Sequence, residues 1–211
     1  CYAQLQPEEI ASIAGVDLVL GSKEKFDIFT HIDSFNKAKV ARIEVSPIDE
    51  VNNFGIASSV GSFDRTRAFL KFQDGCDFTC AFCTIPLARG ESRSLPIENT
   101  VSQALEVVKE GYKEIVLTGV NVGDYGKRLG TNLCSLLREL ERIDGIERIR
   151  ISSIEPNLLT DELLDFWIGS TKICKHFHIP LQAGTNELLK GMRRRYQTER
   201  YAEKVQKIKK A

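Results

Sequence analysis

The sequence contains no apolar run close to the roughly 18 residues that a membrane-spanning helix needs, and no signal peptide is visible. It also lacks net charge, because Lys+Arg and Asp+Glu both number 29, so charge gives no general case for a nucleic-acid partner. Low-complexity tracts are absent as well. With 42% hydrophobic and 27% charged residues, the composition is that of a globular protein with no membrane partner.

A starting methionine is also lacking, since the first residue is Cys1. Residues 198–211 have a helical pattern that stops before it is complete. We therefore expect the chain to be a piece of a longer protein. Its 211 residues suffice for one complete domain and part of another.

Three segments differ in their sequence pattern. Residues 1–35 are expected to be the C-terminal part of an α/β domain, and their last helix is expected to be capped at Ser22 and to reach Phe35. Residues 36–64 contain turn-forming residues and are expected to be a linker with one edge strand. Residues 65–211 alternate between strand and helix patterns and are expected to form a truncated core domain.

The core domain contains four short apolar segments, each followed by a helical pattern. We expect these segments to be strands over residues 68–72, 115–117, 149–154 and 177–181. Strands that alternate with helices form parallel βα units, which build an open sheet or a barrel with its chemistry at the C-terminal strand ends. Polar or glycine-rich sequence follows all four, namely Asp74-Gly75-Cys76, Thr118-Gly119-Val120-Asn121, Ser152-Ser153-Ile154-Glu155 and Gln182-Ala183-Gly184.

The strongest chemical signal is a loop with three of the six cysteines, Cys76, Cys80 and Cys83. Without a signal peptide, clustered cysteines indicate metal or redox chemistry in a reducing compartment. A 4Fe–4S cube held by three cysteines leaves one iron open for a substrate or cofactor. A zinc site or three buried structural thiols are the alternatives. Zinc needs a fourth ligand, and the three histidines, His31, His176 and His178, are distant from the loop in sequence. His178 can nevertheless approach the loop through the fourth predicted strand.

This Cys-x-x-x-Cys-x-x-Cys pattern after a first strand resembles the radical-SAM superfamily. Further stretches resemble its methylthiotransferase family, and together they cover most of residues 65–200: 67–76, 85–90, 93–94, 114–121, 152–156, 178–184 and 192–196. Their details are most similar to the branch that modifies N6-threonylcarbamoyladenosine in tRNA. The resemblance implies an α/β fold, in which a partial (β/α) radical-SAM barrel with parallel strands follows the end of an α/β methylthiotransferase N-terminal domain.

The resemblance also implies the cofactors. In this superfamily the open iron binds S-adenosylmethionine (SAM), and reductive cleavage of SAM yields a radical that removes hydrogen from an unreactive C–H bond. Family members carry a second 4Fe–4S cluster in the N-terminal domain, and Cys1-Tyr2-Ala3-Gln4 resembles the segment with its third cysteine. The other two cysteines would precede this chain. The family's C-terminal RNA-binding TRAM domain is expected to be absent.

The implied reaction converts C2–H of N6-threonylcarbamoyladenosine at tRNA position 37 to C2–S–CH3, in the cytoplasm. The implied partners are tRNA and an electron donor such as a flavodoxin or ferredoxin. Hydrogen abstraction by a radical needs no side-chain base, so no catalytic acid or base is assigned. The enzymatic alternatives are methylthiolation of isopentenyladenosine in tRNA or of a ribosomal-protein aspartate. The alternative of another class is a non-catalytic Fe–S or zinc module that binds RNA.

Further cofactor-binding candidates follow from the same resemblance. Phe82 matches an aromatic position near the adenine of SAM, and the alternative for Phe82 is an ordinary core residue. Residues that match contacts to the SAM amino group are Thr118, Gly119 and Asn121. Residues that match positions near the ribose or the substrate are Ser153, Glu155 and Gln182. Each of these six can instead simply terminate a strand.

The remaining polar and sulfur-bearing residues are interpreted from their surroundings. Arginines that are candidates for contacts with tRNA phosphates are Arg89, Arg93 and the run Arg193-Arg194-Arg195. A solvated helix face is the alternative for the run. Cys134 and Cys174 lie among apolar residues and are expected to fill the core. His176 and His178 alternate along the fourth predicted strand and are expected to share a face, without a metal role.

Overall fold

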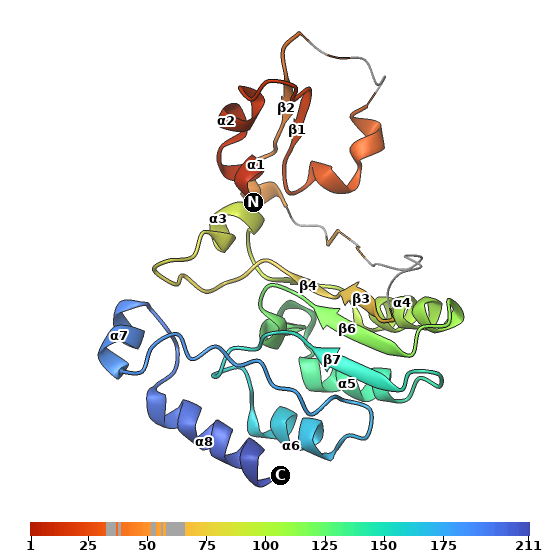
Figure 1. Ribbon diagram of the computed structural model, residues 1–211, viewed down its shortest axis with the longest axis vertical. Helices are drawn as coiled ribbons and strands as arrows, with labels where there is room; N and C mark the ends of the chain where they lie inside the picture. The colour runs from red at the N-terminus through yellow and green to blue at the C-terminus, as the bar shows by residue number, and fades with distance from the viewer. Residues whose placement is uncertain (33–36, 38, 52–53, 56, 58–65) are drawn as a thin grey trace.

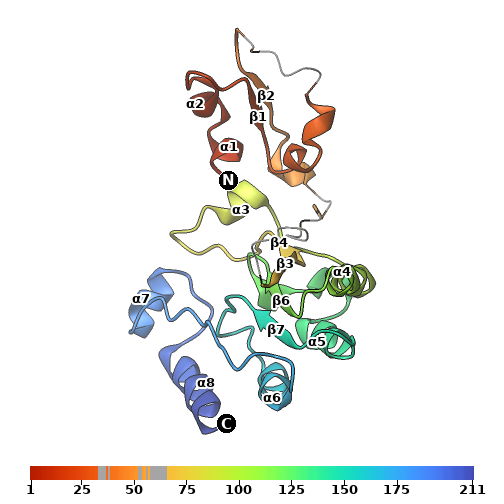
Figure 2. The same ribbon diagram turned by 45° about the vertical axis from the view of Figure 1, so that its right-hand side comes forward.

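The computed structural model describes residues 1–32, 37, 39–51, 54–55, 57 and 66–211. Figure 1 shows a small N-terminal unit next to a larger unit built on a parallel sheet, with helix α3 (Ile85–Arg89) where the two meet. Figure 2, turned by 45°, shows the same arrangement and places helices α4 (Ile97–Lys109), α5 (Leu133–Glu141) and α6 (Asp161–Gly169) side by side along one face of that sheet.

The N-terminal unit is built from two short helices and two short strands. Helices α1 (Tyr2–Leu5) and α2 (Pro7–Ala11) pack beside strand β1 (Leu18–Leu20), which pairs in parallel with strand β2 (Arg42–Glu44). Pro7 occupies the first turn of α2, where its missing N–H costs no hydrogen bond. Strand β2 falls within the predicted linker and matches the strand expected there, while the domain boundaries themselves stay predictions.

The helix predicted between Ser22 and Phe35 is not formed as a continuous element. The chain makes two 3-10 turns instead, Glu24–Phe26 and Ile28–Thr30. Asp27, between these turns, has a φ of −117° and a ψ of 37°, which lie outside the helical region and interrupt the hydrogen-bond pattern. The predicted end at Phe35 lies outside the described residues.

The larger unit is built on three parallel strands in the order β3–β6–β7. They are β3 (Ala68–Lys71), β6 (Glu114–Thr118) and β7 (Arg148–Ile151), and they confirm the first three predicted strands. Alternate residues such as Leu70, Leu117 and Ile151 are buried in the core. Within the described part of the chain the sheet is open, as expected for a partial barrel.

Three amphipathic helices cover one face of this sheet (Figure 2). They are α4 (Ile97–Lys109), α5 (Leu133–Glu141) and α6 (Asp161–Gly169), and their apolar faces join the core. The side chain of Asn132 caps α5 by accepting a 2.9 Å hydrogen bond from the N–H of Ser135. The hydroxyl of Thr160 caps α6 in the same way, as predicted.

The fourth predicted strand, residues 177–181, is not formed. An isolated parallel bridge joins Ile149 of β7 to Ile173, and no ladder follows it in the described residues. The carbonyl oxygen of Cys174 accepts a 2.8 Å hydrogen bond from the indole N–H of Trp167, so this carbonyl is engaged with a helix. Further along, the carbonyl oxygen of His178 accepts a 3.0 Å hydrogen bond from the N–H of Ile154, but the described residues of this segment form no strand ladder.

The remaining elements lie around the end of the sheet. Strands β4 (Gln73–Asp74) and β5 (Arg93–Ser94) pair in antiparallel fashion. Helices α7 (Asn186–Gly191) and α8 (Thr198–Lys210) confirm the two last predicted helices. Among the described helices, none is long and apolar enough to cross a membrane.

Candidate functional site

The cysteine loop begins directly after β4, beyond the C-terminal end of β3. Gly75 starts it with a φ of 71°, and a Cβ atom there would lie 2.0 Å from the carbonyl oxygen of Glu91. Only glycine fits such a position. The N–H of Cys76 then donates a 3.1 Å hydrogen bond to the carbonyl of Gly90. This backbone path puts the cysteines at the edge of the sheet where the sequence predicts the chemistry.

The buried side chain of Gln73 connects the cysteine loop to the turn after β6. Its Nε2 donates to the carbonyl oxygens of Asp74 (3.0 Å) and Gly75 (2.9 Å). Its Oε1 accepts from the N–H groups of Val120 (2.9 Å) and Asn121 (2.8 Å). One amide therefore satisfies backbone groups of two distant segments. Gln73 was not among the sequence candidates, although its polar side chain at the end of an apolar strand is a signal that could have marked it.

Asn121 faces the first cysteine of the loop. Its Nδ2 lies 3.6 Å from the Sγ of Cys76, and its buried Oδ1 has no hydrogen-bond partner in the described residues. Gly119 packs so closely against Gln73 that a Cβ atom would lie 2.8 Å from the Gln73 Oε1. Thr118 donates its hydroxyl to a carbonyl of β3. A buried acceptor without a partner, next to a thiol, is a group that a donor on a bound ligand can satisfy.

All three cysteines of the loop are half-buried and free. Burial raises the pKa of the Cys76 thiol above its ordinary value, and hydrogen bonds from Phe78 and Asn121 lower it by less. Among the described residues, no three His, Cys, Asp or Glu side chains converge on a point where a single metal ion would lie. An iron–sulfur cube differs, because each thiolate binds a different iron.

Arg194 joins Cys80 to Glu155. Its Nη1 lies 3.0 Å from the Sγ of Cys80, and its Nη2 forms an ion pair with the Glu155 carboxylate. The side chain of Arg194 is only 4% exposed, so neither a solvated helix face nor a phosphate contact describes it. Burial by itself lowers the pKa of Arg194, but the hydrogen bond and charge of Glu155, together with the charges of Cys80 and Tyr196, outweigh burial and raise the pKa above its ordinary value.

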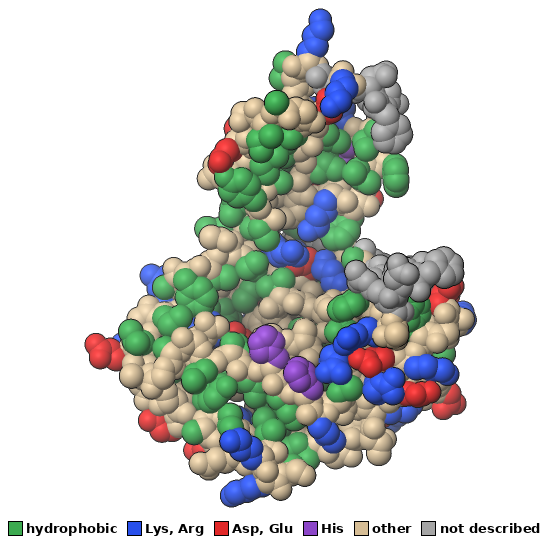
Figure 3. Space-filling view, viewed as in Figure 1, with side chains coloured by type: hydrophobic (Ala, Val, Ile, Leu, Met, Phe, Trp, Pro, Cys, Tyr) green, Lys and Arg blue, Asp and Glu red, His purple; other side chains and the backbone are tan. Residues whose placement is uncertain are grey.

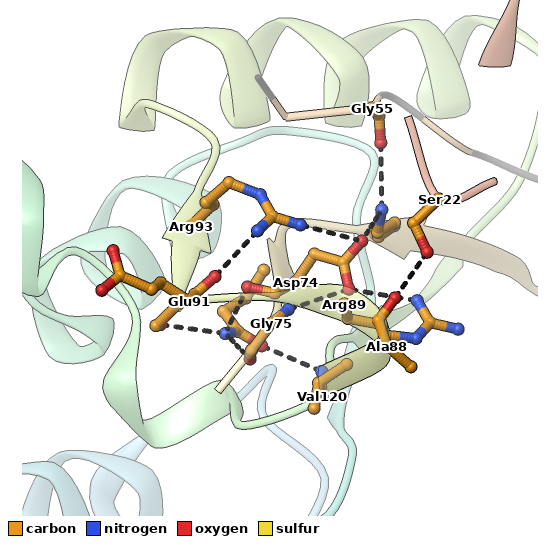
Figure 4. A network of polar contacts seen from close by, with 12 residues as sticks. Ser22, Gly55, Asp74, Gly75, Ala88, Arg89, Glu91, Arg93 and Val120 are labelled. Atoms are coloured by element: carbon orange, nitrogen blue, oxygen red, sulfur yellow. Dashed lines mark hydrogen bonds and ion pairs between the residues drawn. The ribbon is translucent and has the colours of Figure 1, made fainter. Parts of the chain in front are cut away.

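Asp74 forms ion pairs with three basic side chains at the base of the cysteine loop (Figure 4). Its buried carboxylate pairs with Lys71 at 2.6 Å, with Arg89 at 3.0 Å and more loosely with Arg93 at 3.9 Å. Figure 3 shows basic side chains around an acidic one where the two units meet. Burial raises the pKa of Asp74, but Lys71 and Arg89 outweigh it and hold the pKa below its ordinary value. Both arginines are thus engaged inside the protein.

The N-terminal unit contacts the same region through α3. The hydroxyl of Ser22 donates a 2.6 Å hydrogen bond to the carbonyl of Ala88 and does not cap a helix (Figure 4). Cys1 lies at the beginning of α1, which packs against α3, and Figure 1 shows the chain terminus beside that helix. The exposed Cys1 therefore lies near α3, the helix that begins two residues after Cys83.

The other sequence candidates are Phe82, which lies within the loop, and Ser153 and Gln182, which follow the third and fourth predicted strands. Phe82 is 55% exposed, Ser153 is half-buried, and Gln182 is exposed with a φ of 64°. Within the described residues, no hydrogen bond joins these three side chains to the cysteines, and their roles stay predictions. Cys134 is buried in the core as predicted, and Cys174 is half-buried.

Two cavities of about 550 Å³ each flank the base of the loop. One is lined by Thr118, Gly119 and other residues at the end of β6. The other is lined by Cys76 and Asp77. The first thiol of the loop therefore borders a cavity of the size that small ligands occupy. His176 and His178 are exposed, and Figure 3 shows two adjacent histidine side chains on the open face of the larger unit.

Comparison with known proteins agrees with this geometry. The family model of the radical SAM superfamily matches residues 70–211, which include the whole cysteine loop and the parallel sheet. The chain belongs to the radical SAM superfamily. It therefore carries a radical-SAM enzyme domain, whose cofactors are a 4Fe–4S cluster and SAM.

Curated methylthiotransferases are similar to this radical-SAM chain over nearly all of its residues. Threonylcarbamoyladenosine tRNA methylthiotransferase MtaB of Bacillus subtilis is 46% identical over 100% of the chain and 47% of its own length. The protein of the same name from Thermotoga maritima is 42% identical over 99% of the chain and 47% of its own length. A tRNA-2-methylthio-N(6)-dimethylallyladenosine synthase from Thermodesulfovibrio yellowstonii is 36% identical over 97% of the chain and 46% of its own length. The chain spans about half the length of the curated relatives it matches.

Solved radical-SAM structures share the fold at low sequence identity. The radical S-adenosylmethionine methyltransferase TsrM from Kitasatospora setae, solved with cobalamin and a [4Fe-4S] cluster, gives a TM-score of 0.54 at 16% identity over 65% of this chain and 28% of its own. The cobalamin-dependent S-adenosylmethionine radical enzyme OxsB gives a TM-score of 0.53 at 16% identity over 65% of this chain and 21% of its own. These matches confirm the predicted α/β fold with parallel strands.

Proposed function

We propose that the protein containing this chain is a tRNA methylthiotransferase that converts C2–H of N6-threonylcarbamoyladenosine at position 37 to C2–S–CH3. One observation carries the proposal. Three half-buried thiols lie at the C-terminal edge of a parallel sheet, with Asn121 and Glu155 next to them through direct or bridged contacts. The substrate rests on the similarity to relatives named for this base, which extends over nearly the whole chain.

The proposed ligands of the radical-SAM cluster are Cys76, Cys80 and Cys83. The donor set fits a 4Fe–4S cube, since three thiols from one loop can each bind one iron and leave the fourth iron open. When bound, the cluster and SAM supply the chemistry that removes hydrogen from an unreactive carbon. The chain itself needs no acid or base for that step, so its residues serve to bind, to orient and to exclude water.

SAM binding is assigned to the ends of β6 and β7. The orphaned Oδ1 of Asn121 is the proposed acceptor for the SAM amino group, and Gly119 permits the close packing that holds this turn in place. Glu155, anchored by Arg194, is proposed to face the ribose or the substrate. Further proposed contacts, carried over from the resemblance alone, are Phe82, Thr118, Ser153 and Gln182.

Cys1 is the proposed third ligand of a second 4Fe–4S cluster in the intact protein. Its support is the resemblance and the position of α1, which packs against α3, the helix that follows the cysteine loop, with the Cys1 thiol exposed. The other two ligands would come from sequence outside this chain. We also propose tRNA as substrate, a flavodoxin or ferredoxin as electron donor, and the cytoplasm as location.

The substrate is tested by nucleoside analysis of tRNA. A strain that lacks the full-length gene is expected to lose the methylthio derivative of N6-threonylcarbamoyladenosine, and the intact gene is expected to restore it. A gene carrying Cys80→Ala is expected to fail, whereas Cys174→Ala serves as the matched control and is expected to succeed. The assignment is wrong if the derivative persists undiminished in the deletion strain and no second enzyme makes it.

The same strain separates the alternatives. Loss of the methylthio derivative of isopentenyladenosine would point to the branch represented by the Thermodesulfovibrio relative. Loss of a methylthio group on a ribosomal-protein aspartate would point to a protein substrate. Anaerobic reconstitution distinguishes an enzyme from a binding module, because an enzyme gains iron and responds optically to SAM, whereas one tightly bound zinc ion would contradict the proposal.

A further inference from the structure

Arg194 is separated from Cys80 by 114 positions in the sequence, yet its guanidinium lies 3.0 Å from the cysteine sulfur. The guanidinium nitrogen next to Cys80 is Nη1, and the other terminal nitrogen, Nη2, forms an ion pair with Glu155. The Nε is buried without a hydrogen-bond partner in the described residues. A nearly fully buried cation is costly unless strong partners compensate for its lost hydration. Its partners here are a carboxylate and a proposed cluster ligand, so the charge lies directly against the proposed cluster site.

The chain around Arg194 covers the cysteine loop. The N–H of Ala81 donates a 3.1 Å hydrogen bond to the carbonyl of Met192. The guanidinium of Arg195 lies 4.1 Å from the ring centroid of Phe78, and it also donates to the carbonyl of Asp77 at 3.2 Å. These contacts fix the backbone on both sides of Arg194 against the loop. The position of its side chain is therefore set by several independent interactions.

A backbone turn separates the neighbouring arginines. Arg193 has a φ of 57°, in the left-handed region, directly after the C-terminal end of α7. Arg193 is exposed, whereas Arg194 points inward to the loop. Two adjacent residues of the same type and charge thus occupy opposite environments, which makes one a matched control for the other.

We propose that Arg194 is a positioning residue of the radical-SAM cluster that hydrogen-bonds the Cys80 sulfur and raises the reduction potential of the cluster. This inference rests on the proposed function, because it takes Cys80 as a cluster ligand. Hydrogen bonds to ligating sulfurs and a nearby positive charge both stabilise the more negative, reduced state. Glu155 holds the guanidinium in place and at the same time links this corner of the cluster to the proposed SAM side of the site.

The test uses the full-length protein, reconstituted anaerobically, as wild type, Arg194→Gln, Arg194→Lys and Arg193→Gln. The reduced fraction of the cluster is measured against potential by electron paramagnetic resonance, using the signal that changes when SAM is added. Arg194→Gln is expected to lower the ratio of reduced to oxidised cluster about tenfold at a fixed potential, which corresponds to about 59 mV for a one-electron couple. Arg194→Lys keeps the charge and is expected to recover part of this loss.

Arg193→Gln removes the same charge one residue away and is expected to titrate like the wild type. The proposal is overturned if Arg194→Gln also titrates like the wild type. It is equally overturned if both Arg194 variants lose iron and thermal stability together while their residual cluster keeps the wild-type potential, since a purely structural role predicts that result. A wild-type protein without any SAM-sensitive iron signal would instead refute the proposed function, and the inference with it.

Discussion

The side-chain oxygen of Gln73 accepts a 2.8 Å hydrogen bond from the backbone N–H of Asn121, although 48 positions separate the two residues. The same side chain is completely buried and also binds the backbone at the start of the cysteine loop. The loop and the turn after β6 therefore share one rigid anchor. The distance between the Cys76 sulfur and the side-chain Oδ1 of Asn121, which has no hydrogen-bond partner in the described residues, therefore depends on Gln73.

Replacement of Gln73 by leucine tests this anchor. The partly buried N–H of Val120 and the buried N–H of Asn121 would lose their acceptor, and each buried group left unsatisfied costs about 1–3 kcal/mol. We expect Gln73→Leu to lower the free energy of unfolding of the apoprotein by at least that amount, measured by urea unfolding, and to lower the yield of reconstituted iron. Gln206→Leu, on the exposed face of α8, is the control and should change neither. Equal stabilities for the two variants would show that the anchor does not matter.

Gly119 provides a second test of the same packing. A Cβ atom at this position would lie 2.8 Å from the Gln73 Oε1 and 3.0 Å from its Cβ, so Gly119→Ala must displace the anchor. Overpacking of this kind costs about 1–3 kcal/mol. We expect weaker SAM binding by the reconstituted protein, measured by isothermal titration calorimetry. Gly169→Ala at the end of α6 meets no atom within 4 Å and should bind SAM like the wild type.

The three cysteines of the loop are expected to be individually indispensable for the cluster. Cys76→Ala, Cys80→Ala or Cys83→Ala should each remove about four irons per chain after anaerobic reconstitution, because the cube loses one of only three protein ligands. Iron is measured by a colorimetric assay and by visible absorbance. Cys174→Ala removes a half-buried thiol outside the loop and should retain the iron. Full iron content in any of the three loop variants would contradict the assigned ligand set.

Asp74 makes stability depend on pH in a defined direction. Its pKa is held below the ordinary value in the folded protein, so its contribution is fully present above the unfolded pKa of about 3.9 and is lost as the pH falls through the folded pKa. Asp74→Asn leaves three cations without their buried partner and should cost about 3–5 kcal/mol at pH 7. The difference from wild type should shrink as the pH falls below about 4.

The matched control for this change is Asp144→Asn, because Asp144 is exposed in the turn after α5. Both variants are measured as apoproteins by urea unfolding between pH 7 and pH 3. If the difference in unfolding free energy between wild type and Asp74→Asn grew toward acid pH, the carboxylate of Asp74 would not be stabilised by its basic neighbours.

Several features could be predicted because they depend on residues close together in the sequence. The spacing of Cys76, Cys80 and Cys83 lies within one loop, and the first three strands and the cap at Thr160 follow from local patterns. The fourth predicted strand, residues 177–181, was wrong. One cause is local, because Pro180 has no N–H to donate to a ladder. The other cause is tertiary, because the carbonyl of Cys174, before the predicted strand, accepts a hydrogen bond from Trp167.

The sequence by itself determined the chemistry: three thiols in one loop, at the end of the first strand of a parallel sheet, are specified by short-range spacing and hydrophobic pattern. Only the tertiary structure decided which polar residues serve that loop. Gln73 and Arg194 bind partners 48 and 114 positions away in the sequence. The sequence of a run of three arginines is the same whether its middle side chain is exposed or buried. Burial and long-range hydrogen bonds arise when the chain folds back on itself, so a local pattern can mark Gln73 as a polar residue at a strand end but cannot identify its partners.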